Sequence, residues 1–232
     1  MSDIDTTRPS ADRRLADIRA RIAHAATLAG RNPADIELIA VSKTRTAAEI
    51  APLIAAGQAS FGENRVQEAE GKWPELRASG DRQGGGSLRL HLVGQLQSNK
   101  ARDAVALFDA IHAIDRPSLI EALARAIGAS GRRPECFVQV NIGEEPQKGG
   151  CAIDALPGIL AQARDAGLPL AGLMAVPPAG VEPAPYFALL AKFAGDHGLA
   201  GLSMGMSSDF ETAVMLGATH VRVGTALFGE RS

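Results

Sequence analysis

ELIAVSKTRTAAEI, residues 37–50, holds a strand-to-helix unit that decides the class of fold. The apolar run 38–41 is short and ends abruptly, as expected of a buried strand. Thr46 and Glu49 then have the spacing of a capping box, which predicts that a helix begins almost at once. Lys43 is therefore expected at the C-terminal end of a buried strand, just before a helix.

The same unit recurs along the chain. Strand-like runs lie at 36–42, 59–62, 88–94, 110–114, 135–142, 170–176, 201–204 and 219–223, with helical patterns between them. Two further capping boxes, Ser118/Glu121 and Ser208/Glu211, predict helix starts. The strand count indicates an α/β fold, a single (β/α)8 TIM-type barrel over residues 10–232. An extra N-terminal helix is expected over 10–30, and residues 1–9 are expected to be disordered.

The main competing fold is an open doubly wound sheet. That fold often carries GxGxxG after its first strand, and this sequence has none. The low-complexity segment RASGDRQGGGSLR, residues 77–89, is interpreted as a surface loop.

Composition excludes several classes of function. The 232 residues carry a net charge of −2 and no long basic run, so no nucleic-acid partner is expected. No apolar segment approaches the roughly 20 residues of a membrane span, and no signal peptide is present. Cys136 and Cys151 form no zinc pattern, and the histidines form no HExxH motif, so no metal is expected. We expect free thiols in a reducing compartment and a cytoplasmic protein.

A barrel places its site at the C-terminal ends of its strands. Most of the residues found there are polar or small, and the set is Ser42, Lys43, Glu63, Asn64, His91, Gln95, Gln97, Asn141, Met174, Ser203, Met204, Ser207, Arg222, Gly224 and Thr225. Taken alone, Lys43 is more often a surface residue closing a strand, and His91 more often a structural histidine. The chemical alternative for Lys43 is an imine with an aldehyde.

VRVGTALFGE, residues 221–230, favours the chemical alternative. Gly224 lets a ligand approach the backbone, and Thr225 offers an amide and a hydroxyl at the start of a helical turn, which suits a phosphate. SMGMSSDFE, residues 203–211, supplies the other half of the expected phosphate site through Ser203 and Ser207. Ser208 is interpreted as a helix cap. A lysine, a phosphate cradle and Arg222 together fit pyridoxal 5'-phosphate (PLP).

Six stretches also carry a resemblance to a known family: AVSKT (40–44), FGENRVQE (61–68), HLVGQLQSNK (91–100), VNIGEEPQKGG (140–150), GLMAVPP (172–178) and LSMGMSSDFETAVMLGATHVRVGTALFGER (202–231). The sequence resembles the pyridoxal phosphate homeostasis protein family, single-domain PLP-binding barrels of fold type III related to the N-terminal domain of alanine racemase. The resemblance implies that PLP is covalently bound to Lys43 as an internal aldimine.

The remaining site roles also come from that resemblance. Ser203, Gly224 and Thr225 would hold the phosphate, and Arg222 would face the pyridine nitrogen. The pocket would be lined by Asn64, His91 and Met174.

Two functions stay open at this point. One is a carrier that buffers PLP or delivers it to apo-enzymes, and the other is an amino-acid racemase. The related racemases use a tyrosine from a second domain and a partner subunit, which this sequence is not expected to contain. Its only tyrosine, Tyr186, falls in a predicted helix. An arginine at the ring nitrogen weakens the ring as an electron sink. We therefore predict a monomeric carrier that acts in PLP homeostasis, with no catalytic residues and no substantial amino-acid turnover.

Overall fold

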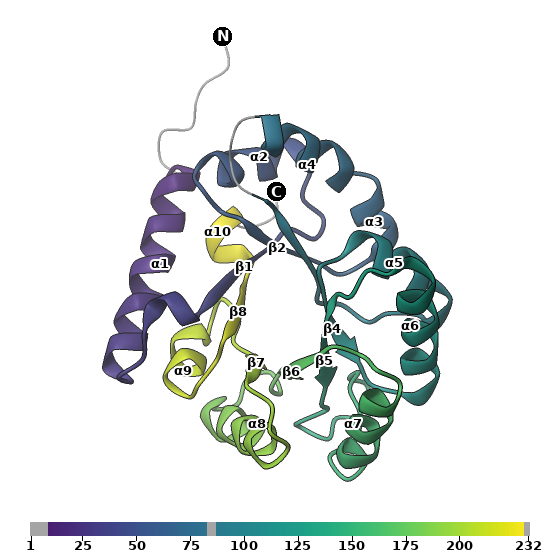
Figure 1. Ribbon diagram of the computed structural model, residues 1–232. Helices are drawn as coiled ribbons and strands as arrows, with labels where there is room; N and C mark the ends of the chain where they lie inside the picture. The colour runs from purple at the N-terminus through teal and green to yellow at the C-terminus, as the bar shows by residue number, and fades with distance from the viewer. Residues whose placement is uncertain (1–8, 83–86, 230–232) are drawn as a thin grey trace.

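The computed structural model describes residues 9–82 and 87–229, which form a closed barrel of parallel strands (Figure 1). The strands pair in sequence order, and β8 closes the barrel against β1. They are β1 (Glu37–Val41), β2 (Ser60–Glu63), β3 (Arg89–Leu92), β4 (Ala110–Ile114), β5 (Glu135–Gln139), β6 (Leu170–Met174), β7 (Gly201–Ser203) and β8 (His220–Val223). The predicted (β/α)8 barrel is confirmed, and the open sheet is excluded.

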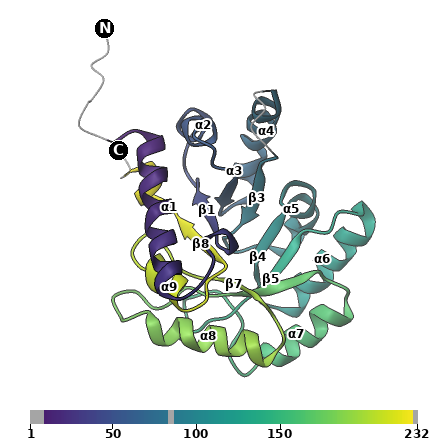
Figure 2. The same cartoon turned by 60° about the vertical axis from the view of Figure 1, so that its left-hand side comes forward.

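Helices surround the barrel as an outer ring (Figures 1 and 2). They are α1 (Ala11–Leu28), α2 (Ala47–Ala55), α3 (Val66–Glu70), α4 (Trp73–Arg82), α5 (Ala101–Leu107), α6 (Pro117–Ser130), α7 (Leu156–Asp165), α8 (Ala184–Asp196), α9 (Phe210–Met215) and α10 (Thr225–Phe228), with 3-10 turns at Pro33–Asp35 and Ser98–Lys100. The predicted N-terminal helix is α1, which packs on α9 and carries the Arg21–Glu211 ion pair at 2.6 Å. None of the helices in these ranges is both long and apolar enough to cross a membrane.

The local predictions had mixed outcomes. The capping box of Thr46 and Glu49 is present at the start of α2. The box predicted at Ser118 is wrong, because α6 begins one residue earlier, at Pro117, and has no side-chain cap. The box predicted at Ser208 is also wrong, because the residue preceding α9 is Asp209.

Two predictions concern segments at the edge of the described chain. The expected loop 77–89 is helical through Arg82, where α4 ends, and residues 83–86 lie outside the described ranges. Residues 1–8, which make up nearly all of the stretch expected to be disordered, lie outside them too.

Strand β1 shows how the fold aims the candidate lysine. Side chains alternate along a strand. Ile39 and Val41 face the barrel interior, where both would contact a Cβ at Gly62. Lys43 follows in the same alternation and reaches the C-terminal mouth. Ser42 takes the opposite side and donates from Oγ to Glu63 Oε1 at 2.6 Å.

Candidate functional site

A pocket of about 460 Å³ opens at the C-terminal mouth of the barrel. Its volume falls within the range typical of small-molecule sites. Its lining comes from six strand ends and the loops after them: Val41, Lys43, Asn64, Val93, Val176, Met206, Ser207, Ser208, Arg222, Gly224 and Thr225. The rule that barrel sites lie at strand C-termini therefore located the pocket correctly.

The structure divides the predicted site residues into two groups. Five of them line the pocket: Lys43, Asn64, Arg222, Gly224 and Thr225. The other three, His91, Met174 and Ser203, are buried and do not belong to its lining. The Ser203 hydroxyl, expected to hold phosphate, is instead hydrogen-bonded to Arg222 and His112. The polar residue Glu63 is fully buried and bonded to Ser42, outside the pocket lining.

The turn that carries Lys43 is held in place from below. Thr44, the next residue, has a φ of +62°, a conformation that non-glycine residues rarely adopt. The Lys72 ammonium donates to the carbonyls of Ser42 and Arg45, each at 3.0 Å, on either side of that turn. Since both bonds come from a charged donor, they fix the backbone from which Lys43 projects.

Two loops in the same part of the barrel, after β7 and β8, present unpaired backbone amides. Within the described residues, the amides of Ser207 and Ser208, and those of Thr225 and Ala226 at the start of α10, have no hydrogen-bond acceptor. The two loops are joined by a bond from the Gly224 amide to Ser207 Oγ at 3.3 Å. Converging amides and hydroxyls of this kind form a binding site for an anion such as phosphate. We call this group of residues the anion cradle.

Arg222 lies between the lysine and the deeper interior. Its terminal nitrogens donate to the carbonyls of Ser203 at 2.6 Å and Ala175 at 2.9 Å. Burial lowers the pKa of Arg222 to about 10, partly offset by the negative charge of Asp209. The guanidinium therefore stays charged at neutral pH. Its Nε–H has no acceptor in residues 9–82 and 87–229, which leaves that donor for a ligand.

Several lining residues were missed by the sequence analysis. Val41, Val93 and Val176 lie two residues from Lys43, His91 and Met174, so strand alternation could have identified them. Ser208 was interpreted only as a helix cap, but it lines the pocket. In the same loop the Met206 amide donates to Asp209 Oδ1 at 2.6 Å.

Neither cysteine nor metal chemistry is apparent elsewhere. Cys136 and Cys151 are free and buried, and burial raises the pKa of each thiol to about 12. Across the described part of the chain, no group of three or more His, Cys, Asp or Glu is placed to hold a metal ion.

Replacing Thr225 by Val tests the anion cradle. The change removes one hydroxyl at the start of α10 and preserves the shape of the side chain. We expect a loss of about 1.5–3 kcal/mol in PLP binding, because a hydrogen bond to a charged group is worth that much. Fluorescence titration measures the affinity, and the absorption band of the bound cofactor should change little. Unchanged affinity would remove Thr225 from the cradle.

The geometry defines a class: a (β/α)8 barrel whose described mouth pocket is lined by one lysine, an anion cradle and a buried arginine. The sequence profile of the family described as "Alanine racemase, N-terminal domain" matches residues 14–232, so the chain belongs to that family of barrels. An alanine racemase from Clostridium difficile shares this fold at a TM-score of 0.66 and 16% identity, covering 93% of this chain and 57% of the racemase.

Within that class the chain belongs to the pyridoxal phosphate homeostasis protein family. The proteins of that name from Pseudomonas aeruginosa and Escherichia coli K12 are 41% and 40% identical to it. Each match covers 94% of this chain. It covers 94% of the Pseudomonas aeruginosa protein and 95% of the Escherichia coli protein. PipY of Synechococcus elongatus, solved with PLP bound, matches at a TM-score of 0.80 and 41% identity over 94% of this chain and all (100%) of that one.

Proposed function

We propose that this protein binds PLP and acts in intracellular PLP homeostasis, as a buffer or carrier of the cofactor. One observation supports the proposal above the others. Lys43, Arg222 and residues of the anion cradle line the same pocket. PLP has an aldehyde, a ring nitrogen and a phosphate, and this arrangement offers a partner for each. The names of the relatives and the PLP-bound PipY support the same ligand.

In this proposal Lys43 Nζ forms a covalent bond to the aldehyde carbon, with loss of one water molecule. Asn64 borders the ring, and Arg222 donates to the ring nitrogen. The amides of the anion cradle receive the phosphate. When bound, PLP supplies an electron-accepting ring, and Arg222 limits that capacity because a guanidinium keeps the ring nitrogen unprotonated.

The composition of the pocket favours a carrier over a racemase. The related racemases use two bases, a lysine and a tyrosine opposite it, to move protons at the substrate carbon. Among the described residues that line the pocket, Lys43 is the single ordinary base, and no histidine, cysteine, tyrosine or carboxylate accompanies it. Tyr186 lies on α8 and packs against the helix layer. The carrier interpretation also includes a monomeric, cytoplasmic protein, which light scattering and cell fractionation test.

The loaded protein should show no substantial turnover of amino acids. Incubation with L- and D-alanine, serine and glutamate, followed by separation of enantiomers, measures racemisation directly. Product formation that is robust in the wild type and absent in Lys43→Ala would contradict the carrier role and support the alternative, an alanine-racemase-type enzyme.

PLP should pass from the loaded protein to an apo-enzyme. The covalent bond is reversible, and the pocket lies at the open mouth of the barrel. The measurement is activation of an apo-PLP enzyme with and without alkaline phosphatase, which destroys free PLP. Activation that survives the phosphatase supports direct delivery, whereas activation that vanishes reduces the role to buffering.

A further inference from the structure

A continuous run of polar side chains crosses the barrel interior beneath the pocket. Arg222 NH1 lies 2.7 Å from Ser203 Oγ, which lies 2.8 Å from His112 Nδ1. His112 Nε2 lies 3.0 Å from His91 Nδ1, and His91 Nε2 lies 3.1 Å from Glu37 Oε1. We call these five residues the interior chain. Barrel interiors are usually filled by branched apolar residues, so a buried polar chain needs a reason.

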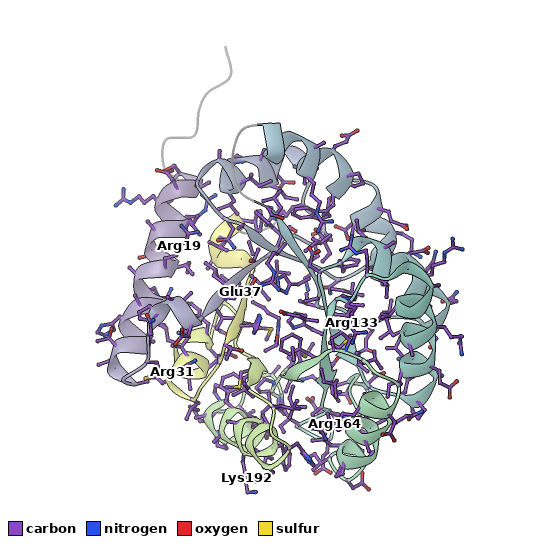
Figure 3. The ribbon with its side chains drawn as sticks, viewed as in Figure 1. Arg19, Arg31, Glu37, Arg133, Arg164 and Lys192 are labelled. Carbon is purple, nitrogen blue, oxygen red and sulfur yellow. The ribbon has the colours of Figure 1, made fainter. Side chains whose placement is uncertain are left out.

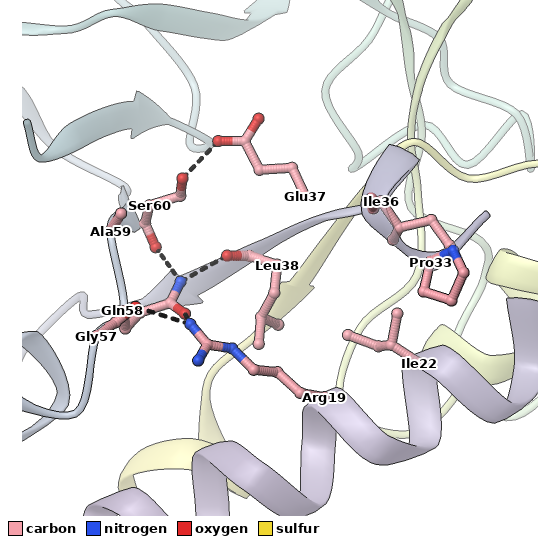
Figure 4. A pocket seen from close by; sticks show the side chains of 11 residues that line it. Arg19, Ile22, Pro33, Ile36, Glu37, Leu38, Gly57, Gln58, Ala59 and Ser60 are labelled. Carbon is pink, nitrogen blue, oxygen red and sulfur yellow. Dashed lines mark hydrogen bonds between the residues drawn. The ribbon is translucent and has the colours of Figure 1, made fainter. Parts of the chain in front are cut away.

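The interior chain runs from the pocket to the opposite end of the barrel. Arg222 lines the pocket at the mouth, whereas Glu37 starts β1 and lines a second cavity, of about 390 Å³, beside α1. Figure 3 shows Glu37 toward the middle of the barrel, and Figure 4 shows it beside Ser60 in that second cavity. His91, His112 and Ser203 are fully buried, so water reaches the interior chain at its two ends, Arg222 in the pocket and Glu37 at the floor.

The chemistry of its two ends fixes the direction of every hydrogen bond. An arginine only donates, and an ionised carboxylate only accepts. With both imidazoles neutral, His91 donates from Nε2 to Glu37 and accepts at Nδ1 from His112 Nε2–H. His112 Nδ1 is then an acceptor for the Ser203 hydroxyl, and Ser203 Oγ accepts from Arg222. All donors therefore point from the guanidinium toward the carboxylate.

Burial supports this arrangement by keeping both imidazoles neutral. Desolvation lowers the pKa of His91 and lowers that of His112 well below its usual value, where the charge of a protonated His91 would lower it further. The His112 ring also stacks on Phe137, with ring centres 4.3 Å apart and an angle of 7° between the planes. The ring is therefore held in the orientation that the interior chain requires.

The carboxylate end is held as an anion. Glu37 also accepts hydrogen bonds from Ser60 at 2.5 Å and His220 at 3.1 Å, and Arg89 lies 3.5 Å away. Burial acts to raise the pKa of Glu37, but the bonds from His220 and His91 outweigh it and hold the pKa well below its usual range. The interior chain thus connects a fixed negative charge to a fixed positive one.

We propose that Glu37, His91 and His112 are positioning residues that hold the Arg222 guanidinium in place and polarise it from the far end of the barrel. Hydrogen bonds in a connected chain strengthen one another. Every direct partner of Arg222 is a neutral oxygen, so the carboxylate at the floor acts through the interior chain, while Asp209 acts on Arg222 through space. The link to PLP rests on the proposed function, because it requires the cofactor to lie against Arg222.

The interior chain does not conduct protons to the pocket. Such a path would need a last member that releases its proton. A guanidinium retains its proton at neutral pH. The interior chain therefore sets the direction and strength of the Nε–H that Arg222 presents.

The first test uses the full-length protein without cofactor. Long-range proton–nitrogen NMR of histidine-labelled protein at about pH 8, above the usual histidine pKa, should show His91 and His112 as neutral Nε2–H tautomers. Either residue found as the Nδ1–H tautomer at that pH would overturn the proposed direction of the bonds.

The second test compares two matched variants. Glu37→Gln removes the charge but keeps an oxygen that can accept from His91. Glu135→Gln is the control, since Glu135 pairs with the same Arg89 at 3.1 Å but is not bonded to the interior chain. We expect the NMR resonance of the Arg222 Nε–H proton to shift in Glu37→Gln. This proton should also exchange with water roughly threefold faster or more than in the wild type. Glu135→Gln should match the wild type, and equal behaviour of the two variants would refute the proposal.

The third test asks whether the effect reaches the cofactor. In protein loaded with PLP, the absorption band should move in Glu37→Gln and stay in place in Glu135→Gln. An unmoved band in both would limit the action of the interior chain to Arg222 and overturn the link to the pocket. If the wild type does not bind PLP, the proposed function fails, and the two tests on cofactor-free protein still decide the role of the interior chain.

Discussion

Lys43→Ala should abolish covalent attachment of PLP while leaving a weaker, reversible complex. The substitution removes the only amine in the described lining of the pocket but changes no residue of the anion cradle. Phosphate-held binding should therefore persist without a covalent bond. Borohydride reduction followed by peptide mass spectrometry should place the cofactor on the Lys43 peptide in the wild type and nowhere in the variant.

A matched control uses a lysine outside the pocket. Lys100 pairs with Asp103 at 3.3 Å and does not line the pocket, so Lys100→Ala should keep full labelling at Lys43. Labelling that follows Lys100 or Lys148 instead would show that the covalent residue has been assigned wrongly.

Arg222→Glu should lower the free energy of unfolding by about 3–5 kcal/mol, the usual cost of breaking a buried, bonded charge. The new side chain would face the carbonyls of Ser203 and Ala175, which now accept from Arg222 at 2.6 and 2.9 Å. The new carboxylate and these two carbonyls are all hydrogen-bond acceptors, and none of the three would have a donor. Urea unfolding followed by circular dichroism measures the loss.

The same variant tests the contact with the ring. If Arg222→Glu is folded enough to be loaded, its carboxyl favours a protonated ring nitrogen, so the absorption band should move and slow transamination of bound amino acids should increase. Arg222→Lys is the control, because it keeps the charge and should lose less stability. A wild-type unfolding midpoint and an unchanged band in Arg222→Glu would show that Arg222 contacts neither the carbonyls nor the ring.

The sequence predicted the barrel because local signals agreed with the fold. Most strands are short segments rich in apolar residues, and the alternation of these segments with helical patterns left few possible topologies. Lys43 was identified for the same reason, because the C-terminal ends of all barrel strands lie at the same mouth. The helix α4 was missed because Ser79 and Gly80 are poor helix formers, and the fold overrides that preference.

Depth inside the barrel could not be read from the sequence. His91 and Lys43 both follow the alternation that faces the interior, yet one contacts Glu37 at the floor and the other lines the mouth. Their relative height depends on strand tilt and on register, such as the pairing of Gly62 with His91. For the same reason the sequence could not show that the Ser203 hydroxyl lies against Arg222 and His112 below the pocket.

The two sides of the pocket come from opposite ends of the chain. Lys43 belongs to the first strand-and-helix unit, whereas the anion cradle ends at α10, and Arg45 joins them by donating to the Gly229 carbonyl at 2.6 Å. Domains emerge from the ribosome N-terminal part first. A nascent chain thus exposes Lys43 long before the residues that would hold a phosphate, so on the proposed function phosphate-held capture of the cofactor would mark a barrel whose synthesis has passed residue 225.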